Sequence, residues 1–352
     1  LESLRQLIRE TQLDLPAGLP PMIAGLFGYL GYDMVRQMEY LPDAPPDDLN
    51  LPEAIMMRPG LFAVFDTVSD ELILAAPVRP ATGEDAGAAW DKAHALLARA
   101  RTCLAGALPV APEAVIPTAF EAPHSTFSRE EFCAAVEKIQ DYIAAGDAFQ
   151  VVPSQRFSAP FTLPSLALYR SLRRINPAPF LFHLDLGAFS LVGSSPEILV
   201  RLREETMTVR PLAGTRPRGK TEEEDLWLEQ DLLNDQKERA EHLMLIVLGR
   251  NDVGRVCQPG SVKVTEQFVI ERFSHVMHIS SNVEGTIRQD LDALDALIAA
   301  FPAGTLTGAP KIRAMEIIDE IERSRRAPYA GCLGYFGAGG EMATCLGVRM
   351  AG

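Results

Sequence analysis

Long hydrophobic runs, paired cysteines and basic clusters are all scarce in this chain of 352 residues. No apolar stretch approaches the roughly 18 residues that a membrane-spanning helix needs, so we expect no membrane association. The five cysteines are scattered and form no C-x-x-C pair. This argues against a disulfide framework or a zinc site and favours a reducing, cytoplasmic setting. The formal net charge of −14 argues against nucleic-acid binding, because an acidic surface repels phosphates.

The composition is that of an ordinary globular protein. Hydrophobic residues make up 47% and charged residues 23%, enough to bury a large core in about two domains. The sequence begins at Leu1 without a methionine and stops at Gly352 directly after an apolar run. We therefore expect a protein that is truncated at both ends.

The chain changes character around a proline-rich stretch from Pro109 to Pro123. We predict an N-terminal region over 1–110 that contributes sheet and regulatory elements, a linker over 111–124, and a catalytic region over 125–352. Strand patterns come in runs and do not alternate strictly with helices, so the fold class is α+β, with layered β-sheets and flanking helices.

Periodicity and punctuation predict the individual elements. A capping box at Ser128 to Glu131 and a stop at Gly146 bound one helix, 128–145. The other predicted helices are 1–12, 86–104, 222–249, 290–300 and 310–323. The predicted strands are 22–33, 61–67, 71–75, 148–155, 180–184, 189–192, 198–202, 207–211, 262–264, 273–280, 333–336 and 344–350.

Two glutamates on the predicted helix 222–249 form a candidate cation site. Glu238 and Glu241 are three residues apart, so both carboxylates lie on one helix face. Oxygen donors at this spacing suit a hard cation such as Mg²⁺. A solvated helix face, with Lys237 and Arg239 as neighbours, is the alternative from spacing alone.

A second candidate is the segment Gly304–Lys311, which approaches a helix with proline at its first position. Free backbone N–H groups there can bind a carboxylate or phosphate, although the G-K-[ST] of a P-loop is missing. Taken alone, the pattern favours an ordinary capped helix start. Loops at 194–197 and 210–219 carry a carboxylate and several arginines, and either can be a plain surface loop.

His275 and His278 flank an apolar, β-branched segment that we interpret as a strand, so that one imidazole points inward. A neutral imidazole can act as a general acid or base near pH 7. The alternative is a histidine that is merely satisfied in the core.

Taken together and in order, eight segments resemble the chorismate-utilising enzymes, and the resemblance covers nearly the whole chain. They are AGDAFQVVPSQR (145–156), NPAPFLF (176–182), GSSPEILV (193–200), RPLAGTRPRG (210–219), KERAEHLMLIVLGRNDVGRV (237–256), SHVMHI (274–279), GTLTGAPK (304–311) and CLGYF (332–336).

Two positions favour the anthranilate synthase component I branch of this family. Relatives that add water carry a lysine base where this chain has Gln150, and aminodeoxychorismate synthases often carry a nucleophilic lysine where it has Ala213. Without either lysine, added ammonia is the expected nucleophile. The resemblance thus implies conversion of chorismate and ammonia to anthranilate and pyruvate, in tryptophan biosynthesis.

The resemblance also implies roles for individual residues. It makes Glu197 the general acid/base near the reacting ring carbons and His278 the residue that assists loss of the C4 hydroxyl. Glu238 and Glu241 are the expected ligands of Mg²⁺. The expected substrate contacts are Gly214, Thr215, Thr305, Tyr329 and Arg349, and the expected tryptophan effector pocket includes Pro179, Phe180 and Leu181.

The implied partner is a glutamine amidotransferase subunit that supplies ammonia. Departures from the family pattern are Val247 and Ala343, where aspartate is usual, and the absence of the N-terminal L-L-E-S segment and of the C-terminal strand and helix with their further metal ligands. Two alternatives therefore remain, an aminodeoxychorismate synthase component I and a non-catalytic homologue that binds the partner or an aromatic effector.

Overall fold

The computed structural model describes residues 1–108 and 121–352, which form two compact units. Unit 1 comprises Leu1–Gly28, Met56–Ile116 and Tyr335–Met342, and unit 2 comprises Tyr29–Ile55, Pro117–Gly334 and Ala343–Gly352. The units interleave along the chain, whereas the ranges predicted from sequence, 1–110 and 125–352, are contiguous. The predicted linker, 111–124, lies mostly outside the described residues, and the functional division of the chain stays a prediction.

Unit 1 contains helix α1 (Glu2–Thr11), the hairpin β3 (Phe62–Asp66) and β4 (Glu71–Ala75), and helix α2 (Ala86–Ala105). The strands predicted over 61–67 and 71–75 are confirmed, and they pair as a hairpin. Asp66 Oδ1 accepts hydrogen bonds from the backbone N–H of Val68 and Ser69, which closes the turn. Helix α2 is confirmed as well, and the Asp85 side chain caps its start. Ile23, Ala24 and Ala338 form a small buried core, against which apolar side chains of both hairpin strands pack.

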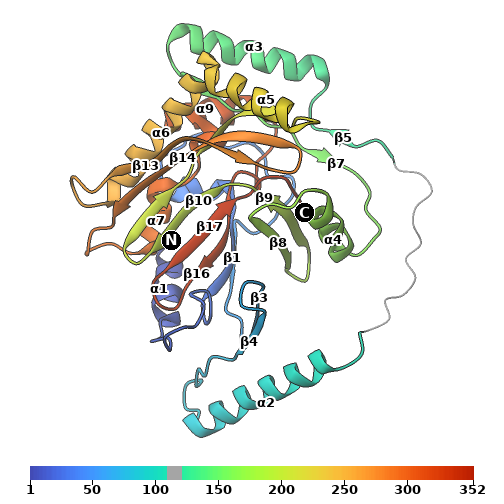
Figure 1. Ribbon diagram of the computed structural model, residues 1–352, viewed down its shortest axis with the longest axis vertical. Coiled ribbons are helices and arrows are strands. Elements are labelled where there is room, and N and C mark those ends of the chain that lie inside the picture. The colour runs from blue at the N-terminus through green and yellow to red at the C-terminus, as the bar shows by residue number, and fades with distance from the viewer. Residues whose placement is uncertain (109–120) are drawn as a thin grey trace. The chain divides into compact units, whose positions relative to one another are not determined.

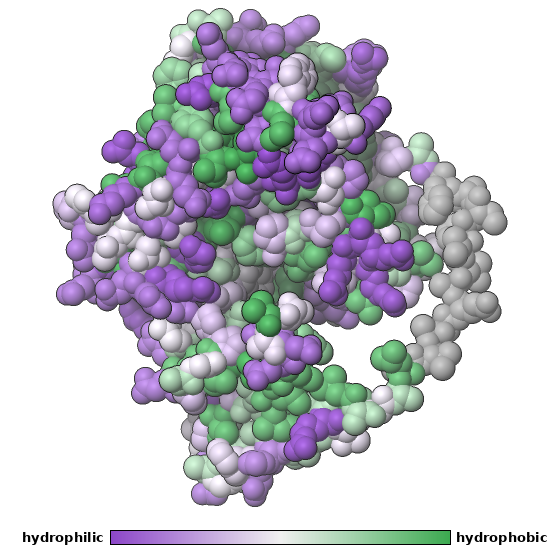
Figure 2. Space-filling model, in the orientation of Figure 1, coloured by the Kyte–Doolittle hydropathy of each residue, from purple (hydrophilic) through white to green (hydrophobic). Residues whose placement is uncertain are grey.

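The largest sheet in the described residues has nine strands in the order β12-β14-β11-β10-β17-β16-β1-β2, with β13 also paired to β14 (Figure 1). Its strands are β1 (Leu26–Leu30), β2 (Ala54–Met57), β10 (Ile198–Arg203), β11 (Thr206–Val209), β12 (Leu212–Pro217), β13 (Lys263–Arg272), β14 (Val276–Thr286), β16 (Cys332–Phe336) and β17 (Met342–Leu346). The pairs among β10 to β14 are antiparallel, as expected of an α+β fold. Hydrophilic side chains cover much of the β13–β14 hairpin (Figure 2).

A smaller sheet contains β8 (Phe180–Asp185), β9 (Ser190–Ser195) and β18 (Met350–Ala351), and helix α4 (Ser165–Ile175) packs against β8 and β9. The chain leaves β9 at Ser195 and enters β10 of the large sheet at Ile198. Glu197 therefore lies in the two-residue link between the sheets, a position fixed by both.

Helices α5 (Glu222–Asn234) and α6 (Gln236–Val256) occupy the range predicted as one helix, 222–249, and that prediction is wrong about its continuity. The chain breaks at Asp235, whose backbone is extended (φ −68°, ψ 112°) and whose side chain accepts from the N–H groups of Lys237 and Glu238. Aspartate competes for backbone donors in this way, so it starts a new helix where periodicity alone continues the old one.

Three of the remaining helices agree closely with their predicted ranges, 128–145, 290–300 and 310–323, whereas two others, η1 (Tyr32–Gln37) and α8 (Gly304–Thr307), were not predicted as helices. Helix α3 (Arg129–Ala145) has both reciprocal bonds of the capping box at Ser128 and Glu131, and Gly146 ends it with φ 85°. The other two are α7 (Ala293–Ala300) and α9 (Lys311–Ile321), and two-residue strands occur at β5 (His124–Ser125), β6 (Gln150–Val151), β7 (Phe157–Ser158) and β15 (Gly308–Ala309).

Some predicted boundaries are wrong. The strand predicted over 148–155 is only the two-residue β6, and the one predicted over 22–33 ends at Leu30, before η1. Pro310 is the N-cap residue of α9, and the helix itself begins at Lys311. Within the described ranges no helix has both the length and the apolarity to cross a membrane.

Candidate active site

The link between the sheets presents the carboxyl group of Glu197. Its Oε1 accepts from Thr305 Oγ1 at 3.2 Å and from the backbone N of Leu212 at 3.4 Å. Burial raises the pKa of Glu197 to about 8, against the smaller lowering by these two donors. The group is therefore mostly protonated at neutral pH and can donate a proton.

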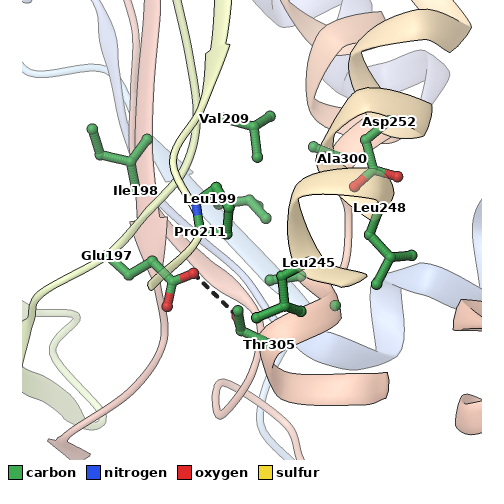
Figure 3. A pocket seen from close by; sticks show the side chains of 13 residues that line it. Glu197, Ile198, Leu199, Val209, Pro211, Leu245, Leu248, Asp252, Ala300 and Thr305 are labelled. Carbon is green, nitrogen blue, oxygen red and sulfur yellow. Dashed lines mark hydrogen bonds between the residues drawn. The ribbon is translucent and has the colours of Figure 1, made fainter. Parts of the chain in front are cut away.

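A small cavity adjoins the rear of this carboxyl group, between the sheet and helices α6 and α7 (Figure 3). Apolar side chains, among them Val209, Leu245 and Leu248, form most of its wall (Figure 3). These side chains exclude most water from one side of Glu197, which is the physical cause of its raised pKa.

His278 lies on β14, which confirms that the segment 276–280 is a strand. Across β12 and β14 it pairs with Thr215, and its Nδ1 is 3.0 Å from Thr215 Oγ1 and 3.1 Å from the carbonyl oxygen of Gly214. A carbonyl can only accept, so Nδ1 carries the proton in the neutral ring and Nε2 has a free lone pair. Burial is the main cause that lowers the pKa of His278, so the ring is neutral at pH 7. His275 is exposed and lies outside the strand.

Gly214 makes a bulge in β12, with φ 73° and a register shift between Ala213 and Thr215. A Cβ atom at this position would lie 3.2 Å from Glu238 Oε2, so the bulge lets the helix carboxylate approach the strand. Glu238 is thereby placed beside the loop that holds His278.

The two helix glutamates lie in the first two turns of α6, and both are partly buried. Glu241 Oε1 accepts from Gln150 Nε2 at 2.8 Å, and the Oε1 atom of Gln150 is buried without a partner among the described residues. Within that same part of the chain the Glu238 carboxylate has no hydrogen-bond donor or cation beside it.

The oxygen atoms of these side chains suit a hard divalent cation that takes its remaining ligands from water and substrate. Among residues 1–108 and 121–352 no group of three or more His, Cys, Asp or Glu residues is close enough to hold a metal. Mg²⁺ is commonly held by one or two carboxylates together with water and substrate oxygens. Glu238, Glu241 and the spare oxygen of Gln150 suit that pattern, and they would not suffice for a fully protein-coordinated metal.

The remaining predicted site residues have different surroundings. Thr305 contacts Glu197 directly, and Arg349, on an exposed turn with φ 50°, is near enough to influence the pKa of Glu197. Tyr329 is partly buried in a turn after α9. Pro179 lies on an open pocket with Pro177, Glu271 and Phe273, whereas Phe180 packs against the core that contains Tyr29 and Leu191.

Sequence reasoning missed Glu271 and Arg326, and it did not anticipate the contact of Gln150 with Glu241. Glu271 is the cross-strand partner of His278 on β13, and its Oε1 accepts from Arg210 Nε at 2.7 Å. Gln150 binds Glu241, and Arg326 lies behind Tyr329. The four-residue spacing of Glu322 and Arg326 was the one local signal, and the contacts themselves depend on the fold.

Comparison with known proteins agrees with this geometry. The family model described as chorismate binding enzyme matches residues 1–352. The chain belongs to this family. It is 55% identical to anthranilate synthase component 1 of Cereibacter sphaeroides over 351 residues, which are 100% of this chain and 70% of that protein. It is 49% identical to anthranilate synthase component 1 of Pseudomonas putida, covering 96% of this chain and 69% of the relative.

A solved structure gives the same answer for the fold. The crystal structure of anthranilate synthase component I from Streptococcus pneumoniae superposes with a TM-score of 0.87 at 35% identity, over 99% of this chain and 76% of that one. The predicted α+β architecture of the anthranilate synthase component I type is thus confirmed. Within the family the chain groups with the anthranilate synthase component 1 proteins, and it spans about 70% of the length of its relative from Cereibacter sphaeroides.

Proposed function

We propose that this chain converts chorismate and ammonia to anthranilate and pyruvate, as the chorismate-converting component of an anthranilate synthase in tryptophan biosynthesis. The observation that carries the proposal is that a protonated Glu197 and a neutral His278 share two charged neighbours, Glu271 and Arg349. His278 also bonds Gly214, which adjoins Glu238 of α6. The similarity to the component 1 proteins supports the same conclusion.

The protonation states support a division of labour between the two groups. Amination forms a bond from nitrogen to ring carbon C2 while the bond from C4 to its hydroxyl breaks. Glu197 is the available acid, so it donates the proton with which the hydroxyl leaves as water. His278 cannot donate from Nδ1, which is held by Gly214, and so its Nε2 serves as a base.

The second step needs that base. Loss of pyruvate requires removal of the proton on C2, after which the ring becomes aromatic, and His278 Nε2 is the neutral acceptor in the site. The resemblance assigns His278 to departure of the hydroxyl, whereas the hydrogen bond to Gly214 supports a role in this later proton removal. The leaving enolpyruvyl group takes up a proton to become pyruvate.

Substrate binding falls to the groups that surround these two residues. Arg349 carries the charge to hold a substrate carboxylate, and Gly214, Thr215, Thr305 and Tyr329 line the approach. Glu238 and Glu241 would hold Mg²⁺, which neutralises the ring carboxylate when it is bound. Two observations support this assignment: the Glu238 carboxylate has no hydrogen-bond partner among the described residues, and Glu241 accepts from the neutral amide of Gln150 and not from a cation.

Ammonia is proposed to come from a glutamine amidotransferase subunit, and the naming of the relatives as component 1 implies such a partner. Free cysteines throughout the chain, two of them exposed, support a cytoplasmic location.

Tryptophan is proposed as a feedback effector at Pro179, Phe180 and Leu181. Saturating tryptophan should then raise the thermal midpoint, and an unchanged midpoint and rate would remove the effector proposal.

The reaction is tested with the purified chain, chorismate, Mg²⁺ and ammonium, which replaces the partner as the source of ammonia. Anthranilate fluorescence should rise, and Glu197→Gln should lower the rate by about 10²–10⁴-fold because an amide cannot donate as an acid. Glu223→Gln, an exposed glutamate on α5, is the matched control and should leave the rate unchanged. Formation of a non-aromatic amine as the final product would favour aminodeoxychorismate synthase instead.

Metal binding has its own test. Calorimetry should show that chorismate binds more tightly with Mg²⁺ than without it, and that Glu241→Gln removes the difference. Equal binding by this variant and by the unaltered chain would refute the metal assignment. Binding without any turnover would favour the non-catalytic alternative.

A further inference from the structure

A buried guanidinium lies behind the proposed substrate contacts, and it is not one of them. The side chain of Arg326 is 2% exposed and that of its charge partner Glu322 is 5% exposed, with Nη2 and Oε1 2.6 Å apart. An ion pair this deep carries a large desolvation penalty, and apolar residues of similar volume often replace such a pair without loss of stability. Its presence calls for an explanation beyond stability.

The hydrogen bonds of Arg326 join three segments that are distant in sequence. Nη1 donates to the carbonyl oxygen of Leu306 at 2.7 Å, and Nη2 donates to that of Val152 at 2.7 Å. Leu306 directly follows Thr305, and Val152 lies two residues after Gln150. Nε completes the set with Glu322 Oε2 at 3.0 Å. One planar group thus fixes the backbone beside Thr305 and Gln150 simultaneously.

Two aromatic rings also lie against the same guanidinium. Arg326 Cζ lies 4.9 Å from the ring centroid of Tyr32 and 5.6 Å from that of Tyr329. Lysine has no planar face, so it cannot reproduce this arrangement. Arg326→Lys would therefore remove this planar contact with the Tyr329 ring.

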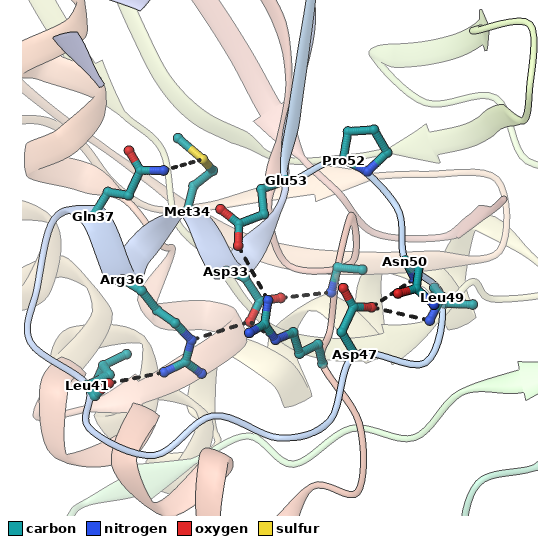
Figure 4. Close-up of polar contacts among 12 residues, drawn as sticks. Asp33, Met34, Arg36, Gln37, Leu41, Asp47, Leu49, Asn50, Pro52 and Glu53 are labelled. Carbon is teal, nitrogen blue, oxygen red and sulfur yellow. Dashed lines mark hydrogen bonds and ion pairs between the residues drawn. The ribbon is translucent and has the colours of Figure 1, made fainter. Parts of the chain in front are cut away.

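The turn that carries Tyr329 is strained and needs support. Ala327 and Ala330 have φ values of 52° and 60°, which side chains other than glycine seldom adopt. The segment η1 braces it: Tyr32 N donates to the Ala327 carbonyl at 2.7 Å, and Asp33 Oδ2 accepts from Ala327 N at 3.2 Å. Asp33 Oδ1 also lies 3.5 Å from Arg36 Nε, and Figure 4 shows these two side chains pointing toward each other.

We propose that Arg326 is a positioning residue for the substrate pocket. It holds the Tyr329 ring and the backbones beside Thr305 and Gln150 at fixed positions relative to one another, and it does not itself contact the substrate. The inference rests on the proposed function, because those three residues are assigned there to substrate and metal contacts. Arg326 acts on binding of the chorismate-like substrate and leaves the second substrate, ammonia, unaffected.

The test compares Arg326→Lys with a chemically matched control, Arg313→Lys. Arg313 also has carboxylate partners, Glu316 and Asp147, and also stacks on a tyrosine, Tyr142. Within the described part of the chain it bonds to neither Val152 nor Leu306, the two carbonyls that Arg326 holds. We expect Arg326→Lys to raise KM for chorismate on the order of 10–100-fold with KM for ammonium unchanged. Arg313→Lys should change neither constant.

A second readout needs no turnover. With 3-fluorotyrosine incorporated, the fluorine resonance of Tyr329, assigned by its loss in Tyr329→Phe, should shift or broaden in Arg326→Lys and stay in place in Arg313→Lys. A lowered thermal midpoint with an unchanged KM and an unchanged fluorine resonance would overturn the proposal in favour of a purely structural role. If the unaltered chain makes no anthranilate, the proposed function fails, and the fluorine comparison still decides whether Arg326 positions Tyr329.

Discussion

Replacing Glu197 by glutamine should change the way in which stability depends on pH. Glutamine has nearly the shape of the protonated acid and stays neutral at every pH. In the native chain the pKa of Glu197 is raised to about 8 from its ordinary 4.5. Below pH 4.5 the carboxyl group is protonated in both the folded and the unfolded chain, so the two proteins should be about equally stable there.

Between those two values the unfolded chain releases the proton and the folded chain keeps it. The free energy of unfolding of the native protein therefore falls as pH rises from about 4.5, and it levels off above about 8. At about 1.4 kcal/mol per pH unit, this interval of 3.5 units (8 minus 4.5) sets an upper limit of about 5 kcal/mol. The side chain keeps some solvent contact, so we expect roughly half of that, about 2–3 kcal/mol.

The assay is urea unfolding of both proteins at one-unit intervals from pH 5 to pH 9. The free energy of unfolding of Glu197→Gln, relative to that of the native chain, should rise steadily up to pH 8. Above pH 8 the difference between the two proteins should stay constant. Glu223→Gln, at an exposed site, should show no such trend. A difference between Glu197→Gln and the native chain that is the same at every pH would refute a raised pKa, and with it the acid role of Glu197.

Three further outcomes are expected. Gly308→Ala should lower the free energy of unfolding, measured by urea titration, by roughly 2–4 kcal/mol. The reason is that φ at Gly308 is 134° and that a Cβ atom there would lie 2.0 Å from the Gln150 carbonyl oxygen. A loss below about 1 kcal/mol would contradict this prediction. Lys311→Met should cost about 3–5 kcal/mol by leaving Asp252 buried without its partner, whose Nζ is 3.0 Å from Oδ1. Adding Asp252→Asn should restore part of that loss, and simple additivity would refute the pairing. His278→Gln should still aminate chorismate while an unaromatised amine accumulates, which chromatography would detect; loss of both steps would assign His278 to the first.

Local signals were sufficient wherever the chain carries its own stop and start residues. The capping box at Ser128 and the helix stop at Gly146 depend only on short segments, and both are present as predicted. The break at Asp235 was missed because apolar periodicity continues across it, and only the capping bonds of the aspartate show that the helix restarts.

Proximity across the fold lay beyond what the sequence alone shows. Glu238 and Glu241 were found from helix spacing, but their neighbours Gly214 and Gln150 come from strands that are distant in the chain. Arg326 looks like one more basic residue in a run of arginines. Its role depends on Leu306, Val152 and two tyrosines meeting around one guanidinium, which only the folded chain displays.

The central claim is that this chain attaches nitrogen to chorismate and releases pyruvate from it. The most direct measurement is mass spectrometry of the products formed from chorismate, Mg²⁺ and nitrogen-15 ammonium. We predict anthranilate that carries the label in its amino group, with one pyruvate released for each anthranilate. Labelled amine without pyruvate, an unlabelled hydroxylated product, or unchanged chorismate would contradict the account.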